Sequence, residues 1–162
     1  MMSYKIENKE KNFDELVSYL EENSYALIRN YFSFDDLNPI WNDLRIVAHV
    51  FMDGIGIKYQ DIPSVEIDRY FVNILSKRPD LQSLLYDRIQ QMPSLLAFQS
   101  NHKIMNLSSK LLGTDRIGVW KRVQMRMDLN SDTYNVIPWH TDYAYNKGTK
   151  YSYTFWVPIV NM

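Results

Sequence analysis

The chain has 162 residues, of which 46% are hydrophobic, and this suits one globular domain with its own core. Its 18 basic and 19 acidic side chains nearly balance and form no block of like charge, which argues against nucleic acid or an anionic membrane as a partner. Cysteine is absent, so disulfide scaffolds and thiolate metal sites are excluded. No apolar run reaches the ~18 residues of a membrane span, and the N-terminus is polar. We therefore expect a soluble, cytoplasmic protein.

A first helix is predicted close to the N-terminus. Asn12 and Glu15 form a capping-box pattern at its start. An apolar stripe with helical spacing runs through Phe13, Leu16, Val17 and Leu20. The next apolar run, residues 25–30, is predicted to form a short strand.

A second helix is predicted to begin near Asn38 and Pro39, because proline is well placed in the first turn of a helix. Gly54 is expected to end it. The residues of this helix that should face the core are Ile40, Trp41, Leu44, Val47, Ala48 and Phe51.

The helical pattern continues over residues 65–112. It is interrupted at Pro79 and Pro93, and Gly113 is its predicted stop. Residues 1–113 are therefore expected to form the mainly helical part of a single domain that spans residues 1–162.

After Gly113 the apolar period changes from the helical value to two, which is typical of strands. One face of the first predicted strand carries Val119, Val123, Met125, Met127 and Leu129, and the other carries Trp120, Arg122, Gln124, Arg126 and Asp128. In the last strand Tyr151, Tyr153, Phe155 and Val157 alternate with Ser152, Thr154 and Trp156. Two or three strands leave open edges, so the β part of residues 114–162 looks incomplete.

His140 and Asp142 stand two residues apart in the stretch "PWHTDYAYNKG". On extended backbone, side chains at this spacing point the same way, so both can reach one ion. A neutral imidazole with a carboxylate suits a borderline ion such as Fe(II) better than Mg²⁺ or Ca²⁺. The alternative is a surface-loop histidine that forms a salt bridge with its neighbouring aspartate.

The surroundings of this pair carry a wider resemblance. A strand leads into Trp139-His140-Thr141-Asp142, an aromatic-rich loop over residues 143–148 contains a glycine, and a strand "TFWVPI" follows at residues 154–159. In this order and spacing the chain resembles the phytanoyl-CoA dioxygenase family of Fe(II)/2-oxoglutarate-dependent oxygenases. Upstream, "YALIRNYFSFDDL" is similar, more loosely, to the N-terminal strand and helix of that family.

The resemblance implies an α+β fold in which residues 114–162 begin a double-stranded β-helix (a jelly-roll, cupin-like sheet). It implies that His140 and Asp142 are the first two metal ligands, with no separate catalytic acid or base. It also places Trp156, Gln124 and Thr154 at the cosubstrate pocket. Fe(II), 2-oxoglutarate and O₂ would be required, and the substrate would be a small organic molecule. Gln124 and Arg126 could line this pocket or lie on the solvent face of an edge strand, and Thr154 could simply be a β-branched strand residue.

The family's third ligand is a histidine well downstream, and an arginine beyond it pairs with the distal carboxylate of 2-oxoglutarate. Neither residue type follows Asp142 in this sequence. We therefore expect a chain that stops before both and is inactive by itself. His49, on an apolar helix, is predicted to be a buried or half-buried structural residue, and His102 to belong to the first turn of a helix.

Two alternatives stay open beside the oxygenase. One is a non-catalytic binding module, or a gene remnant, without a functional metal site. The other is a cupin-like protein that uses a different divalent ion for hydrolysis or isomerisation. Neither the primary substrate nor the oligomeric state follows from the residues.

Overall fold

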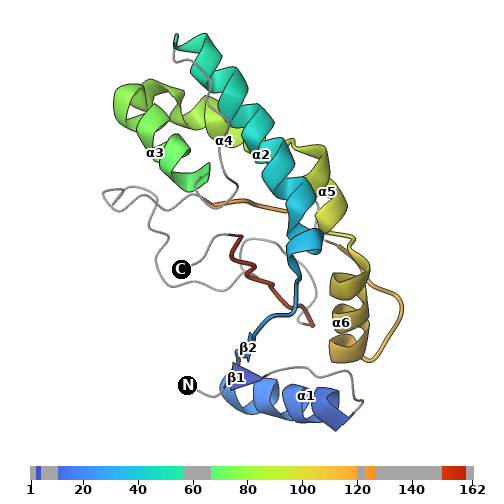
Figure 1. Ribbon diagram of the computed structural model, residues 1–162. Helices are drawn as coiled ribbons and strands as arrows, with labels where there is room; N and C mark the ends of the chain where they lie inside the picture. The colour runs from blue at the N-terminus through green and yellow to red at the C-terminus, as the bar shows by residue number, and fades with distance from the viewer. Residues whose placement is uncertain (1–2, 5–10, 57–66, 120–122, 127–150, 160–162) are drawn as a thin grey trace.

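The structure is a computed structural model that describes residues 3–4, 11–56, 67–119, 123–126 and 151–159 (Figure 1). Its regular elements are β1 (Ser3–Tyr4), α1 (Lys11–Asn23), β2 (Leu27–Ile28), α2 (Phe34–Gly54), α3 (Ile67–Lys77), the 3₁₀ turn η2 (Pro79–Leu81), α4 (Gln82–Gln90), α5 (Pro93–Phe98) and α6 (His102–Leu112). Helices therefore dominate the described part of the N-terminal region, as the sequence predicts.

The long helix α2 begins four residues earlier than predicted. Ser33 caps it, and a complete capping box joins the Ser33 side chain and backbone to Asp36. Pro39 consequently lies inside the helix. A proline there removes one backbone hydrogen bond near the helix start, and the capping box satisfies other amides of the same turn. The predicted end at Gly54 is confirmed.

One apolar cluster, the main core, holds α2, α3, α4 and α5 together. Its buried members are Leu37, Ile40, Trp41, Leu44, Ala48, Phe51, Met52, Phe71, Ile74, Leu75, Leu85, Ile89, Met92, Leu95 and Phe98. Five of the six residues predicted to face the core from α2 are in this set, and the sixth, Val47, packs half-buried against it. The spacing of the apolar residues at three and four positions therefore predicted the buried face of α2 correctly.

A second, smaller cluster lies between α1 and α6, at the lower end of the molecule in Figure 1. Leu16, Leu107 and Leu111 are buried there, and Phe13, Val17 and Leu20 pack around them. The predicted apolar face of α1 is thus confirmed. The predicted cap is not, because α1 starts at Lys11 and Asn12 is already helical.

The predicted strand over residues 25–30 is much shorter in the structure. Only β2 forms, and it pairs in parallel with β1 through Ser3 opposite Leu27 and Tyr4 opposite Ile28. Ser24 and Asn30 have positive φ angles of 62° and 55°. These left-handed residues bend the chain on either side of β2 and limit its length.

The helical region after α3 is divided as the prolines predict. Pro79 opens η2, and Pro93 occupies the first turn of α5. The Asp43 carboxylate on α2 accepts a hydrogen bond of 3.0 Å from the Ser94 amide, so a residue of another helix satisfies an otherwise unpaired N–H of α5. A further break, which the sequence does not signal by proline, separates α5 from α6 at residues 99–101.

Gly113 ends α6 in the left-handed conformation, with φ 64°, which confirms the predicted stop. We expect Gly113→Ala to lower the free energy of unfolding by about 1 kcal/mol, because a Cβ strains this conformation. Gly54→Ala should instead raise it by about 0.5 kcal/mol, since Gly54 is the last helical residue of α2 and alanine favours helix. Neither added methyl group meets another atom within 4 Å. Urea unfolding of both variants measures the predicted difference in sign.

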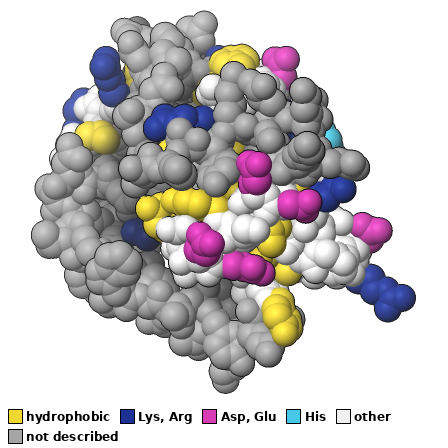
Figure 2. All heavy atoms as spheres, turned by 90° about the horizontal axis from the view of Figure 1, so that it is seen from below, with side chains coloured by type: hydrophobic (Ala, Val, Ile, Leu, Met, Phe, Trp, Pro, Cys, Tyr) yellow, Lys and Arg dark blue, Asp and Glu magenta, His cyan; other side chains and the backbone are white. Residues whose placement is uncertain are grey.

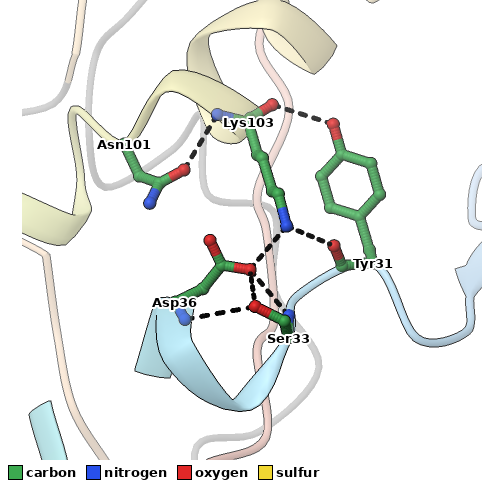
Figure 3. A network of polar contacts seen from close by, with 5 residues as sticks. All are labelled: Tyr31, Ser33, Asp36, Asn101 and Lys103. Carbon is green, nitrogen blue, oxygen red and sulfur yellow. Dashed lines mark hydrogen bonds and ion pairs between the residues drawn. The ribbon is translucent and has the colours of Figure 1, made fainter. Parts of the chain in front are cut away.

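A polar network fastens the start of α2 to the start of α6 (Figure 3). The Lys103 ammonium contacts the Asp36 carboxylate at 2.5 Å, and the side chains are 30% and 11% exposed. The Tyr31 hydroxyl donates to the Lys103 carbonyl at 2.9 Å, and Asn101 caps α6 by accepting from the Lys103 amide. The network therefore lies between the two apolar clusters, where Tyr31 packs on the smaller and Ile104 on the main core.

The face seen from below in Figure 1 shows acidic side chains gathered around a few apolar ones (Figure 2). The outer face of α1, at this end of the molecule, contributes the exposed residues Asp14, Glu15, Glu21 and Glu22. Within the described ranges, no helix combines the length and the apolar character that crossing a membrane requires.

Candidate functional site

Residues 154–159 alternate between the helical core and solvent, as the period of two predicts, whereas Tyr151 and Tyr153, predicted on the same face as Phe155, are 70% and 38% exposed. Phe155 packs on the smaller cluster, and Val157 and Ile159 pack on the main core. Thr154 and Trp156, which lie between them in sequence, are exposed. One side of this segment therefore covers the helices, and the other side carries the residues that the sequence assigns to a cosubstrate pocket.

Side chains and backbone of the helical region anchor this segment. The buried Trp41 of α2 donates its indole N–H to the Ile159 carbonyl at 2.8 Å. At the other end, the Tyr153 hydroxyl approaches the Leu111 carbonyl of α6 at 3.4 Å. Leu111 is in the last turn of α6, where carbonyl groups have no partner within the helix. The segment is thus tied down at both ends.

Residues 123–126 show the same division between two faces. Val123 and Met125 pack on the main core, whereas Gln124 is exposed and Arg126 is half-buried. The carboxamide of Gln90 in α4 holds the Met125 backbone through two hydrogen bonds, of 2.8 and 3.1 Å. Val123 and Met125 thus share the side that packs on the helices, whereas Val119, predicted on the same face, is 46% exposed.

The structure brings the two segments together through Arg126 and Trp156. The guanidinium carbon of Arg126 lies 5.7 Å from the centre of the Trp156 ring. This is a cation–π distance, and the attraction is modest at an exposed tryptophan. Trp156 is nevertheless 72% exposed, so most of the indole surface is open to a ligand. Both alternatives for Arg126, a pocket wall and a solvent-facing side chain, are compatible with this contact.

The remaining predicted site residues divide into two groups. Gln124 and Thr154 are exposed on the same segments as Arg126 and Trp156. His140 and Asp142, the predicted metal ligands, lie outside the described residues. In the part of the chain that the structure describes, no three His, Asp or Glu side chains gather closely enough to hold a metal ion. The same part, over residues 114–119, 123–126 and 151–159, contains no β-ladder, so the jelly-roll stays a prediction.

The other two histidines have the structural settings that the sequence predicts. The His49 imidazole is 3.2 Å from the Asp53 carboxylate one helical turn away, and its side chain is half-buried. His102 is the first residue of α6 and is exposed. Both lie on the helical part of the protein.

Sequence reasoning missed the two side chains that anchor the candidate segments, Trp41 and Gln90. Trp41 was correctly assigned to the core, but its N–H must find an acceptor when buried, and this need was the available signal. Gln90 carries no comparable signal, because a glutamine near a helix end is usually solvated.

Comparison of the chain with protein-family models, with curated proteins and with solved structures found no match in any of the three.

Proposed function

We propose that the protein is an Fe(II)/2-oxoglutarate-dependent oxygenase that resembles the phytanoyl-CoA dioxygenase family and acts on a small organic substrate. The observation that carries the proposal is the H-x-D pair in its sequence context, Trp139 to Asp142 followed by the predicted strand "TFWVPI". The two-sided arrangement of residues 151–159 supports it, because the helices cover one face and leave Thr154 and Trp156 on the other.

His140 and Asp142 would hold the metal, since an imidazole and a carboxylate form a donor set suited to Fe(II). With 2-oxoglutarate and O₂, bound Fe(II) supplies the oxidation of a substrate C–H bond. Trp156, Gln124 and Thr154 would line the cosubstrate pocket, where the indole excludes water and the amide and hydroxyl offer hydrogen bonds. The helical core contributes rigidity, which keeps such groups in place.

A complete site also needs a third ligand and a cation for the distal carboxylate of 2-oxoglutarate. No histidine or arginine follows Asp142 in this sequence. A non-catalytic binding module with the same fold is the alternative candidate. The proposal includes a cytoplasmic location, in keeping with a chain that lacks cysteine.

The test is a calorimetric titration of 2-oxoglutarate into the protein encoded by the full reading frame of the gene, with Fe(II) present and O₂ excluded. We expect His140→Ala to weaken binding by more than about a hundredfold, because removing a ligand should cost at least as much as removing a residue that orients one. His102→Ala is the matched control, since His102 is an exposed helix residue, and it should bind as the wild type does.

Equal affinity in His140→Ala and wild type would refute the assignment of His140. If Fe(II) also leaves the melting temperature of the wild type unchanged, the binding module becomes the better explanation, because a ligand of the native state must stabilise it. Metal-dependent turnover that needs no 2-oxoglutarate and yields no succinate would point to a hydrolase or isomerase.

A further inference from the structure

Gln90 and Met125 form a pairing that normally occurs between two strands. The Gln90 Nε2 donates to the Met125 carbonyl at 2.8 Å, and the Met125 amide donates to the Gln90 Oε1 at 3.1 Å. A glutamine carboxamide is planar and offers one donor and one acceptor side by side. In an antiparallel ladder, a residue of a hydrogen-bonded pair exchanges the same two bonds with the residue opposite. The end of α4 thus takes the place of a neighbouring strand at Met125.

Two bonds to one residue define the orientation of the segment about its own axis, which a single bond would leave free to rotate. With Met125 held in this way, Val123 and Met125 face the main core. Gln124 and Arg126 must then face the other side, because successive side chains of extended backbone alternate. On that side the Arg126 guanidinium lies 5.7 Å from the centre of the Trp156 ring.

We propose that Gln90 is a positioning residue for the candidate site, and that its carboxamide sets the direction of Arg126 toward Trp156, with Gln124 on the same side of the segment. Gln90 does not reach these side chains itself. It acts through the Met125 backbone, from a helix that the main core holds by Leu85 and Ile89. The consequence for cosubstrate binding rests on the proposed function, whereas the consequence for the Arg126–Trp156 contact does not.

The variant Gln90→Met removes both hydrogen bonds with little change in volume or helix propensity. Its readout is fluorine NMR of protein labelled with fluorotryptophan, in which Trp156→Phe identifies the Trp156 signal. Arg126→Ala shows where that signal lies without the guanidinium. We expect the Trp156 signal of Gln90→Met to move most of the way to the Arg126→Ala position.

The matched control is Gln91→Met, because Gln91 follows Gln90 directly but is exposed at the end of α4. Its Trp156 signal should stay at the wild-type position. If folded Gln90→Met leaves the Trp156 signal at the wild-type position, the proposal is overturned. It is overturned as well if Gln91→Met shifts the Trp156 signal as far as Gln90→Met does.

Gln90→Glu provides a second variant should Gln90→Met fail to fold. The ionised carboxylate keeps an acceptor for the Met125 amide but has no proton to donate to the Met125 carbonyl. We expect a shift of the Trp156 signal in the same direction as in Arg126→Ala, but smaller. A wild-type signal in Gln90→Glu would contradict the role of the donated bond.

A calorimetric titration with 2-oxoglutarate and Fe(II), without O₂, separates this proposal from the proposed function. If both hold, Gln90→Met binds 2-oxoglutarate about tenfold more weakly than wild type and Gln91→Met binds equally well, because small displacements of binding groups are costly. If the wild type binds no 2-oxoglutarate, the proposed function fails, and the Trp156 signal still decides the role of Gln90.

Discussion

Leu85→Ala is expected to lower the free energy of unfolding by about 3 kcal/mol, the typical cost of removing three buried side-chain carbons and leaving a cavity. Leu85 is completely buried in the main core, on the face of α4 that packs toward α2. Alanine is an excellent helix former, so helix propensity does not add to the loss.

The neighbouring residue supplies the control for this experiment. Leu84 precedes Leu85 in the same helix but is 46% exposed. Leu84→Ala should therefore cost about 1 kcal/mol or less, because little apolar surface is lost from the interior. Urea unfolding followed by circular dichroism measures both values. Equal losses in the two variants would show that α4 does not pack through the Leu85 face.

Asp36→Asn is expected to lower the free energy of unfolding at pH 7 by about 2 kcal/mol, and to remove a pH dependence that the wild type shows in acid. Burial by itself raises the pKa of the Asp36 carboxyl. Hydrogen bonds from Lys103 and Ser33 and the charge of Lys103 outweigh that effect and lower the pKa to about 2. The substitution keeps the size of the side chain but leaves the Lys103 ammonium, only 30% exposed, without its counter-charge.

The direction of the pH effect follows from proton binding. The ordinary pKa of Asp36 is 3.8 and the folded value is about 2, so the unfolded chain binds the proton more readily. This contribution to stability is therefore complete above about pH 5 and is lost as the pH falls toward 2. The difference in unfolding free energy between wild type and Asp36→Asn should shrink over that range, as measured by urea unfolding at several pH values.

Asp80→Asn is the matched control for Asp36→Asn. Asp80 also pairs with a basic side chain, Arg78, at 2.7 Å, but both side chains are about half exposed or more. Solvent screens such a pair, so its loss should hardly change stability. If Asp36→Asn and Asp80→Asn behave alike at pH 7, the Asp36–Lys103 contact does not fasten α2 to α6.

Local signals in the sequence located most of the helical region. The apolar faces of α1 and α2, the proline breaks at residues 79 and 93, and the stop at Gly113 all depend on neighbours within one or two turns. The predicted start of α2 is wrong although a signal for the true start is present, because Ser33 and Asp36 form a capping box just upstream of Pro39. Pro39 is tolerated inside the helix, so the capping box is a better indicator of the helix start than the proline.

For the candidate site, the sequence predicted the shared side of Val123 with Met125 and of Phe155 with Val157, but not the exposure of Tyr151 and Tyr153 or the contacts that hold the segments in place. The alternation of residues 123–125 and 154–159 follows from the geometry of extended backbone. The contacts that orient the two segments join residues far apart in the chain, namely Gln90 with Met125, Trp41 with Ile159, and Arg126 with Trp156. No local pattern encodes such contacts. The metal ligands predicted at His140 and Asp142 lie outside the described residues and stay a prediction.

By itself, the sequence determined the helical character of the N-terminal region, the buried faces of its helices and the period of two in the candidate segments. These are short-range properties, set by backbone geometry and by the burial of apolar side chains. Only the tertiary structure decided that Lys103 meets Asp36, that Gln90 replaces a strand beside Met125, and that Arg126 lies over Trp156. The physical reason is that such polar contacts form only after the apolar clusters have brought distant parts of the chain together.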